Sequence, residues 1–378
     1  MKFLHLADLH LGKRVNEFPM IEDQKYILLK ILGIIDEEKP DGILIAGDVY
    51  DKAWPSVEAV ALLDSFLSRL AERGIQTFII SGNHDSAERL SFGAGLIDGT
   101  GIHIARAYNG NVTPLTLEDN FGKVNIFMLP FIKPVHVRQA FPDEEIASYN
   151  DAVRAAVAHM DVRPDERNVL ITHQFVTGAV TCASEELSVG GADNVDASLF
   201  DAFDYVALGH IHSPQRITRD TVRYAGSPLK YSFSEAKHKK SVTVVEMAEK
   251  GKVTVRTVPL IPKYDMAEIK GSFDALMTKS YYDKLNLDDY YHITLTDEED
   301  ILDAVTRLRT VYRKIMTLDY DNARTRSSAT LDTEKDVQQL RPIDLVSELF
   351  ETQNGKPMDE AQRDYILKQI ENVWEGDE

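Results

Sequence analysis

The chain has 378 residues, of which 43% are hydrophobic and 27% are charged. This composition is typical of a globular protein of two or three domains, and it excludes disordered, collagen-like and disulfide-scaffold proteins. The formal net charge of −19 excludes a protein that binds nucleic acid through its whole surface, but it leaves room for a local basic strip.

Three features predict a cytoplasmic protein that does not enter a membrane. Cys182 is the single cysteine, so it cannot form an intramolecular disulfide, and a reducing compartment fits best. Asp8 interrupts the N-terminal apolar stretch too early for a signal peptide. The chain contains no apolar run near the ~20 residues that a membrane span requires.

The first half of the chain alternates strand and helix patterns. Apolar periodicity predicts helices over 21–35 and 56–71, with Ser56 as the N-cap of the second. The residues 177–196 have the composition of a loop. Strands are predicted at 3–7, 42–46, 77–80, 124–129, 169–172 and 205–208.

The pattern then changes to strands alone, at 222–224, 241–246 and 253–258. Alternating strands and helices followed by strands predict an α/β fold in which layered sheets are flanked by helices. Pro259 and Pro262 indicate a domain boundary. Beyond it we expect a small α+β unit with a strand at 291–295, a helix over about 298–316 and a strand at 317–320.

The C-terminal region is predicted to be a linker over 322–334 and a helical hairpin over 335–378. The hairpin could read DNA, pack on its own chain or dock on a partner helix. Its 11 acidic against 5 basic residues oppose DNA reading, and the other two interpretations stay open. The predicted domains are 1–262, 263–321, 322–334 and 335–378.

Polar residues follow five of the predicted strands. Residues two apart in an extended chain project to the same side, so each of the pairs Asp8/His10 and His210/His212 can reach one ion. Each motif alone also has an ordinary structural explanation, as a cap, a tight turn or an exposed histidine. Together the strand ends supply seven potential ligands: Asp8, His10, Asp48, Asn83, His173, His210 and His212.

Seven ligands are too many for one tetrahedral ion and suit two. Imidazole, carboxylate and amide oxygen without thiolate favour manganese, iron or zinc over calcium. Two such cations stabilise both the attacking and the leaving oxygen of an in-line displacement at phosphorus. The residues therefore predict a dinuclear phosphoesterase site.

Other reactive side chains have simpler explanations. His5 points to the opposite sheet face from Asp8, which favours a structural role, and Cys182 lacks a neighbouring base that would make it a nucleophile. No ligand-like neighbours accompany His103, His136, His159, His238 and His292.

Five sequence blocks, 3–12, 47–51, 82–86, 207–212 and 224–235, resemble the calcineurin-like metallophosphoesterases, and within them the branch of the bacterial nuclease component SbcD. Sequence motifs carry the resemblance over about residues 1–260. In the remainder of the chain, only the order of the predicted elements is similar. The resemblance implies a two-sheet sandwich flanked by helices, with a small α+β capping domain that closes a DNA cleft and a C-terminal helical hairpin.

The resemblance also implies roles for the site residues. Asp8, His10, Asp48 and His212 would hold one ion, and the expected metal is manganese. The bridging Asp48 would hold the second ion together with Asn83, His173 and His210. His84 would stabilise the transition state or protonate the leaving oxygen, and Asp85 would orient it. Archaeal and eukaryotic relatives have a second histidine where this chain has Asp51.

A local basic strip follows the last histidine motif. The segment 213–240 has seven basic and two acidic residues, which indicates either a solvated face or contact with a DNA backbone. The candidate DNA contacts are Lys13, Arg14, Arg216, Arg219, Arg223, Lys230, Lys237, Lys239 and Lys240.

The function that the resemblance implies is a double-strand exonuclease and single-strand or hairpin endonuclease of DNA recombination, replication and repair. It would work with the SMC-like ATPase SbcC, docked through the hairpin, as a homodimer within a heterotetramer. A phosphoprotein phosphatase or a cyclic-nucleotide phosphodiesterase on the same scaffold is the alternative. A catalytically inactive DNA-end tether is a third interpretation, which the complete ligand set opposes.

Overall fold

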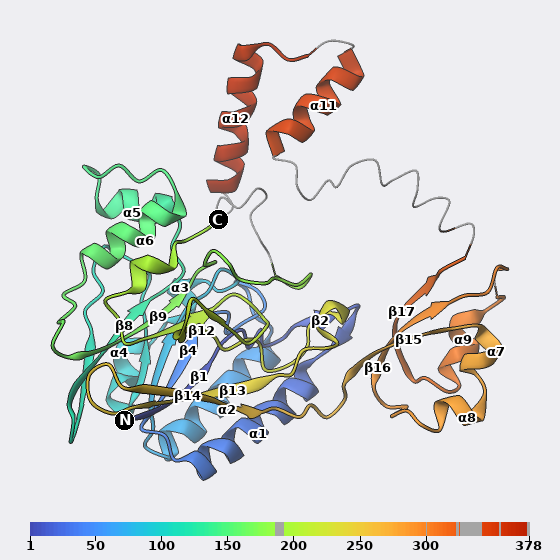
Figure 1. The fold of residues 1–378 in the computed structure, drawn as a ribbon, viewed down its shortest axis with the longest axis horizontal. Coiled ribbons are helices and arrows are strands. Elements are labelled where there is room, and N and C mark those ends of the chain that lie inside the picture. The colour runs from blue at the N-terminus through green and yellow to red at the C-terminus, as the bar shows by residue number, and fades with distance from the viewer. Residues whose placement is uncertain (186–192, 300, 323–324, 326–341, 355–356, 376–378) are drawn as a thin grey trace.

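The computed structural model describes residues 1–185, 193–299, 301–322, 325, 342–354 and 357–375 (Figure 1). Most of the predicted linker lies outside these residues. Within them, no helix is both long and apolar enough to cross a membrane.

One six-stranded sheet is built around the N-terminal strand. Its parallel part runs β1–β4–β5–β6, and β13 and β14 extend it antiparallel on the far side of β1. The bounds are β14 (Val253–Pro259), β13 (Ser241–Met247), β1 (Lys2–Leu6), β4 (Gly42–Ala46), β5 (Gln76–Ile80) and β6 (Ile102–Ile104).

A second six-stranded sheet faces the first. Its four inner strands β12, β10, β9 and β8 are parallel, and the edge strands β11 and β7 are antiparallel to their neighbours. The bounds are β11 (Gln215–Ile217), β12 (Arg219–Tyr224), β10 (Tyr205–Gly209), β9 (Arg167–His173), β8 (Gly122–Leu129) and β7 (Leu115–Asp119).

The core has three layers because each sheet buries both faces. Phe3, Phe78 and Ile171 are among the side chains that fill the space between the sheets. The outer face of the first sheet is covered by α1 (Ile21–Glu38) and α2 (Val57–Glu72), and that of the second by α5 (Pro134–Ala140) and α6 (Tyr149–Ala158). The predicted α/β architecture of sheets flanked by helices is confirmed.

Local signals place most of these elements. The Ser56 hydroxyl accepts a hydrogen bond from the Ala59 N–H, as an N-cap should. Sequence reasoning missed α6, where Ser148 forms a capping box with Asp151. His5 is buried between the sheets with its Nδ1 2.9 Å from the Tyr205 hydroxyl, as a structural residue.

A third sheet of three parallel strands follows the sandwich: β15 (Met266–Gly271), β16 (Tyr290–Leu295) and β17 (Lys314–Tyr320). It carries the short helices α7 (Phe273–Leu276), α8 (Lys279–Tyr282) and α9 (Ala304–Arg309), and its core includes Tyr291, Leu308 and Ile315. We refer to residues 266–320 as the cap unit.

The predicted helix over 298–316 is wrong at both ends, because α9 spans only Ala304–Arg309. Asp303 has φ 57°, and this left-handed conformation prevents the helix from extending toward its N-terminus beyond Ala304. At the other end, Lys314 and Ile315 pair in parallel with Tyr290 and Tyr291. Pairing with β16 satisfies their backbone groups and buries Ile315, and this outweighs the local helical pattern.

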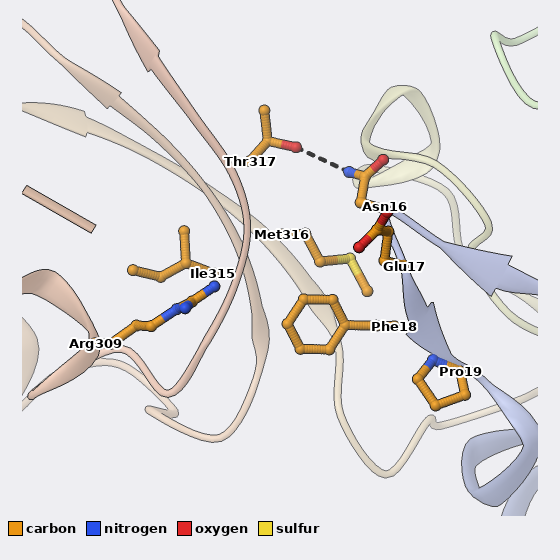
Figure 2. Close-up of a pocket in the computed structure, with 8 residues that line it drawn as sticks. All are labelled: Asn16, Glu17, Phe18, Pro19, Arg309, Ile315, Met316 and Thr317. Carbon is orange, nitrogen blue, oxygen red and sulfur yellow. Dashed lines mark hydrogen bonds between the residues drawn. The ribbon is translucent and has the colours of Figure 1, made fainter. Parts of the chain in front are cut away.

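The cap unit contacts the sandwich beside a small hairpin formed by β2 (Arg14–Val15) and β3 (Phe18–Pro19). The Asn16 amide of this hairpin donates to the Thr317 hydroxyl at 2.8 Å, and both residues line a cavity of about 530 Å³ (Figure 2). Next to it, the Tyr290 hydroxyl donates to Asp23 of α1 at 2.9 Å.

Two helices, α11 (Pro342–Asn354) and α12 (Glu360–Glu375), pack on each other at the C-terminal end of the described chain (Figure 1). They fall within the range 335–378 of the predicted hairpin, of which residues 335–341, 355–356 and 376–378 lie outside the described residues. Ile343 is buried, whereas Leu349 and Tyr365 are 60% and 62% exposed.

A buried ion pair joins the N-terminus to the second sheet. The Arg167 guanidinium, 2% exposed, binds Asp119 and donates to the carbonyl of Ala248 at 3.0 Å, and Asp119 also accepts from the N-terminal amine at 2.7 Å. The Arg167 hydrogen bonds hold the pKa of Asp119 well below its usual range.

We expect Asp119→Asn to lower the free energy of unfolding by about 3 kcal/mol, because it leaves a buried guanidinium without its counter-charge. The contribution of the wild-type carboxylate should be complete above about pH 4 and lost as the pH falls further, since the folded-state pKa is depressed. Urea unfolding followed by circular dichroism measures both. Asp220→Asn, which breaks the exposed Arg216–Asp220 pair, is the control, and an equal loss in both variants would contradict the assignment.

Candidate metal centre

The five predicted strand ends meet, although they belong to different sheets. Asp8, Asp48 and Asn83 follow β1, β4 and β5 of the first sheet, whereas the histidine motifs follow β9 and β10 of the second. Because the two parallel cores face each other and end at the same edge, all seven predicted ligands gather there.

The first group of ligand atoms comes from Asp8, His10 and His212. The Nε2 atoms of His10 and His212 lie 3.0 Å apart, and one ligand atom from each of the three residues falls within 4.8 Å of the others. All three side chains are buried. Imidazole nitrogens that converge with a carboxylate in this way fit a cation between them.

Asp48 connects this group with a second one. Its Oδ2 lies 3.6 Å from His10 Nε2 and 3.3 Å from His173 Nε2. The amide oxygen of Asn83 is 3.0 Å from His173 Nε2 and 3.0 Å from His210 Nδ1. Asp48 therefore stands between two ligand groups, where a bridging carboxylate would be needed.

The backbone is strained at four of the predicted ligands. The φ angles are 52° at Asp8, 44° at His10, 48° at Asp48 and 102° at His210, a region that non-glycine residues seldom adopt. Hydrogen bonds between the strand ends hold these conformations, including His10 N–H to the Asp48 carbonyl at 2.9 Å and His210 N–H to Asp8 Oδ1 at 2.9 Å. Strain of this kind is typical of functional sites.

Two glycines permit the close approach of the strand ends. A Cβ atom at Gly82 would collide with the Asp48 carboxylate, and one at Gly209 would collide with the carbonyl of Ala46. The glycines of the Gly-Asn-His-Asp and Gly-His-x-His motifs are therefore steric requirements of the site.

The site sets the charge of its ligands before any cation binds. Burial lowers the pKa of His10 well below its usual range, and burial together with His173 lowers that of His210 to about 3. Burial alone would raise the pKa of Asp48, but His173 and His10 outweigh it and hold that pKa well below its usual range. Although burial opposes the effect, the Asp48 charge raises the pKa of His173 to about 9.

The residues fit divalent cations. Asp8 Oδ2 is a buried atom with no hydrogen-bond partner among the described residues, and Asp8 shares one ligand group with His10 and His212 and another with Asp48 and His173. A buried polar atom in this position needs a partner, because an unsatisfied buried polar group is costly. A donor set of neutral imidazoles, carboxylates and an amide oxygen suits such a cation.

His84 lies at the rim of the site. Its Nε2 is 3.9 Å from Asp48 Oδ2, its backbone N–H donates to Asp48 Oδ1 at 3.0 Å, and its side chain is 13% exposed. Its Nδ1 is 3.1 Å from the backbone carbonyl of Asp51, which can only accept. That contact orients the ring so that Nε2 faces the ligand groups.

The Asp85 carboxylate binds the backbone. It accepts hydrogen bonds from the N–H groups of Gly82, Val49 and Tyr50, at 2.9, 3.0 and 2.8 Å. These contacts tie the loop after β4 to the loop after β5, so Asp85 positions the peptide that carries His84.

The structure separates the basic residues predicted to contact DNA into buried or paired residues and residues closer to solvent. Lys240 is the clear correction: it is 4% exposed, and its ammonium binds Glu235 inside the protein because that buried carboxylate needs a counter-charge. Lys13 pairs with Asp51 at 2.6 Å and Lys230 with Asp265 at 2.7 Å.

The remaining cations lie closer to solvent. Arg216 pairs with Asp220, and Arg219 donates to the carbonyls of Phe200 and Phe203. Arg223 is half-buried. The exposed positions of the predicted set include Arg14, Lys237 and Lys239.

Sequence reasoning missed several residues that surround the ligands. Glu235 and Ser184 lie against the Nδ1 of His212, at 3.3 and 2.9 Å. Gln24 donates to the carbonyl of His10 at 2.7 Å from the buried face of α1. A polar Gln24 in line with the apolar Leu28 and Ile31 was a signal that could have identified it. Glu235 ends the last of the five resemblance blocks.

Two family models together match most of the chain. The model of the calcineurin-like phosphoesterase family matches residues 1–214, and the model described as "Type 5 capsule protein repressor C-terminal domain" matches residues 262–354. Among solved structures, a dimetal phosphatase from Danio rerio aligns at a TM-score of 0.45 and 10% identity, covering 69% of this chain and 96% of its own.

Two curated relatives match over most of their length, and both are named as the D component of the nuclease SbcCD. The protein from Staphylococcus epidermidis is 35% identical over 322 residues, which is 84% of this chain and 85% of the relative. The protein of the same name from Staphylococcus saprophyticus is 34% identical over 323 residues, covering 84% of each chain. The chain therefore belongs to the calcineurin-like phosphoesterase family and, within it, to the SbcD family of nuclease components.

Proposed function

We propose that this chain is a metal-dependent DNA nuclease subunit that hydrolyses phosphodiester bonds. The observation that carries the proposal is the position of Asp48 between two buried ligand groups at one edge of the sandwich. Membership of the SbcD family supports DNA as the substrate. The single cysteine of the chain, Cys182, forms no disulfide, and this fits a protein of the reducing cytoplasm.

Asp8, His10, Asp48 and His212 would hold one ion, and Asp48, Asn83, His173 and His210 the other. Two divalent cations, which we expect to be manganese, would neutralise charge on the phosphate and lower the pKa of the attacking water. The water would release one proton to solvent, its oxygen would attack phosphorus, the ester P–O bond would break, and the leaving oxygen would take up a proton. In this proposal His84 acts with both ring nitrogens protonated: the Nδ1 proton is donated to the Asp51 carbonyl and orients the ring, and the Nε2 proton passes to the leaving oxygen.

The cap unit supports a nuclease in particular. We propose that it closes a DNA cleft, because it contacts the β2–β3 hairpin, which begins four residues after the ligand His10 (Figure 2). Arg14 in this hairpin and Lys237 and Lys239 after β12 are exposed cations that could contact a DNA backbone. The second family model starts at residue 262, which supports the proposed boundary between 1–262 and 263–321.

We further propose that residues 335–378 dock on an SMC-like ATPase, SbcC, after a linker over 322–334. The relatives are named as one component of a complex, SbcCD. The exposed Leu349 and Tyr365 of α11 and α12 are apolar surface that a partner helix could cover.

The family resemblance also implies a homodimer within a heterotetramer, which we propose for this chain. Three highly exposed apolar side chains of the phosphoesterase domain support it. Phe92 and Leu96 are 89% and 88% exposed, and Val57 is 84% exposed. Arg89 of the same region stacks on the exposed ring of Trp54, with 3.0 Å between the guanidinium carbon and the ring centroid.

Cleavage assays separate this proposal from the alternatives. The purified chain with Mn²⁺ should cut a labelled DNA hairpin and a linear duplex, with and without the ATPase, and a chelator should abolish cutting. Turnover of a phosphoprotein or a cyclic nucleotide without DNA cutting would favour the alternative phosphatase or phosphodiesterase. Absence of bound metal would favour the inactive tether.

His84→Ala should retain both metal ions and DNA binding but reduce cleavage by about 10²–10⁴-fold, because it removes a proton donor and no proposed ligand. Metal content by atomic emission and cleavage of the hairpin substrate measure the two effects. His159→Ala, a half-exposed histidine on α6's C-terminal end, is the matched control. Loss of metal from His84→Ala would show that the role assigned to His84 is wrong.

Metal binding near pH 7.5 should release about one proton, because His173 carries a proton before binding and must lose it to become a ligand. The apparent affinity for Mn²⁺ should therefore rise about tenfold per pH unit between pH 7 and the pKa of His173 at about 9. In acid the affinity should fall further and activity should disappear. Titration calorimetry in buffers of different ionisation enthalpy counts the protons, and a heat that is independent of the buffer would contradict this prediction.

Deleting residues 335–378 should abolish binding to the ATPase and leave both metal ions bound, since the site is built from residues 8–212. Leu349→Asp tests the exposed apolar face without removing a helix. Pull-down or calorimetry with the purified ATPase measures the affinity. If the truncated chain bound as tightly as the full chain, the docking surface would lie elsewhere.

A further inference from the structure

A buried polar cluster lies behind the proposed ligand His212. It consists of Ser184, His212, Ser227, Glu235 and Lys240, and we call it the Glu235 cluster. Glu235 and Ser227 are fully buried and Lys240 is 4% exposed. A carboxylate and an ammonium placed this deep in a protein are costly unless every donor and acceptor is used.

All three ammonium donors of Lys240 have an acceptor. Nζ donates to Glu235 Oε2, to the Ser227 hydroxyl at 2.8 Å and to the backbone carbonyl of His212 at 2.8 Å. The Ser227 hydroxyl in turn donates to the carbonyl of Leu229 at 2.7 Å. Lys240 thus holds Glu235 and the backbone of His212 in one arrangement.

The other oxygen of Glu235 faces the imidazole of His212. Oε1 accepts from the Ser184 hydroxyl and from the Tyr231 N–H at 3.1 Å. Because the single Ser184 proton goes to Glu235, the Ser184 oxygen is left as an acceptor, and it lies 2.9 Å from His212 Nδ1. Glu235 Oε1 itself is 3.3 Å from the same nitrogen.

Both groups next to His212 Nδ1 are therefore acceptors, so the proton of the neutral ring belongs on Nδ1. The Nε2 lone pair then points toward the ligand group, 3.0 Å from His10 Nε2. His173 has a simpler arrangement, with Nδ1 2.8 Å from the carbonyl of Ala46. A partner on the far nitrogen commonly fixes both the tautomer and the ring orientation of a metal ligand.

We propose that Glu235, held by Lys240 and relayed by Ser184, is a positioning residue that presents His212 Nε2 to the ion shared with Asp8, His10 and Asp48. This inference rests on the proposed metal-dependent function. It gives the two ion sites different electrostatic surroundings. In the first site a charged carboxylate faces the far ring nitrogen of the ligand His212, whereas in the second a neutral carbonyl faces the far ring nitrogen of His173.

The test uses the full chain and a double variant, Glu235→Gln with Lys240→Met, which removes both buried charges and leaves neither unpaired. Titration calorimetry with Mn²⁺ should show one of the two sites weakened by about 10–100-fold and the other unchanged. Ser184→Ala should weaken the same site. Asp265→Asn, which breaks the nearby Lys230–Asp265 pair without contacting His212, is the control and should leave both affinities unchanged.

A second measurement separates positioning from folding. Thermal unfolding shows whether the variants fold, and ¹⁵N chemical shifts of histidine-labelled, metal-free chain report which nitrogen of His212 carries its proton. We expect a protonated Nδ1 in the wild-type chain and a mixture of tautomers in Ser184→Ala.

Protonation on Nε2 in the wild-type chain, or a folded double variant that binds both ions as tightly as wild type, would overturn the inference. The tautomer measurement needs no metal, so it tests the inference separately. If the wild-type chain bound no pair of ions, the proposed function would fail instead.

Discussion

The structure depends on the meeting of two parallel sheet edges around one carboxylate, Asp48. Buried at the end of β4, this side chain lies between His10 of its own sheet and His173 of the opposite one. Burial disfavours its charge, and the surrounding imidazoles compensate. The sandwich therefore holds together an arrangement that neither sheet could maintain alone.

Several other features allow the ends of the strands to lie close together. Four ligands have positive φ angles, and the glycines at 82 and 209 leave space that a side chain would fill. Asp85 adds a clamp by accepting from N–H groups of two loops. Strain, missing side chains and a buried carboxylate each lower stability, but here they bring ligand atoms of several residues within 4.8 Å of one another, which suits a cation-binding site.

Around this centre, the protein places ionic groups at different depths. Lys240 and Glu235 form a buried pair whose geometry reaches His212, whereas the exposed cations of the same segment face solvent. The cap unit contacts both α1 and the hairpin that follows the predicted ligand His10. One short segment of chain, 213–240, thus serves both the interior of the site and its surroundings.

Much of this molecule could be predicted from local sequence signals. Strand and helix bounds near the N-terminus follow from apolar periodicity and from caps such as Ser56, and the ligand types follow from polar residues at strand ends. At its C-terminal end the helix expected over 298–316 failed because the strand β16 pairs with residues 314 and 315. Lys240 was misread because its counter-charge and its burial are invisible in a charge count.

The sequence by itself determined which residues stand at the ends of the strands, and with them the chemistry of the ligand set. The family resemblance implied two sheets and a bridging Asp48, and the tertiary structure placed the strand ends at the edge of two facing sheets with Asp48 between the two ligand groups. Only the tertiary structure decided that Glu235 and Ser184 lie behind His212. The physical reason is range: periodicity and capping act over a few residues, whereas the contacts that complete the site join residues separated by up to about two hundred positions, such as His10 and His212.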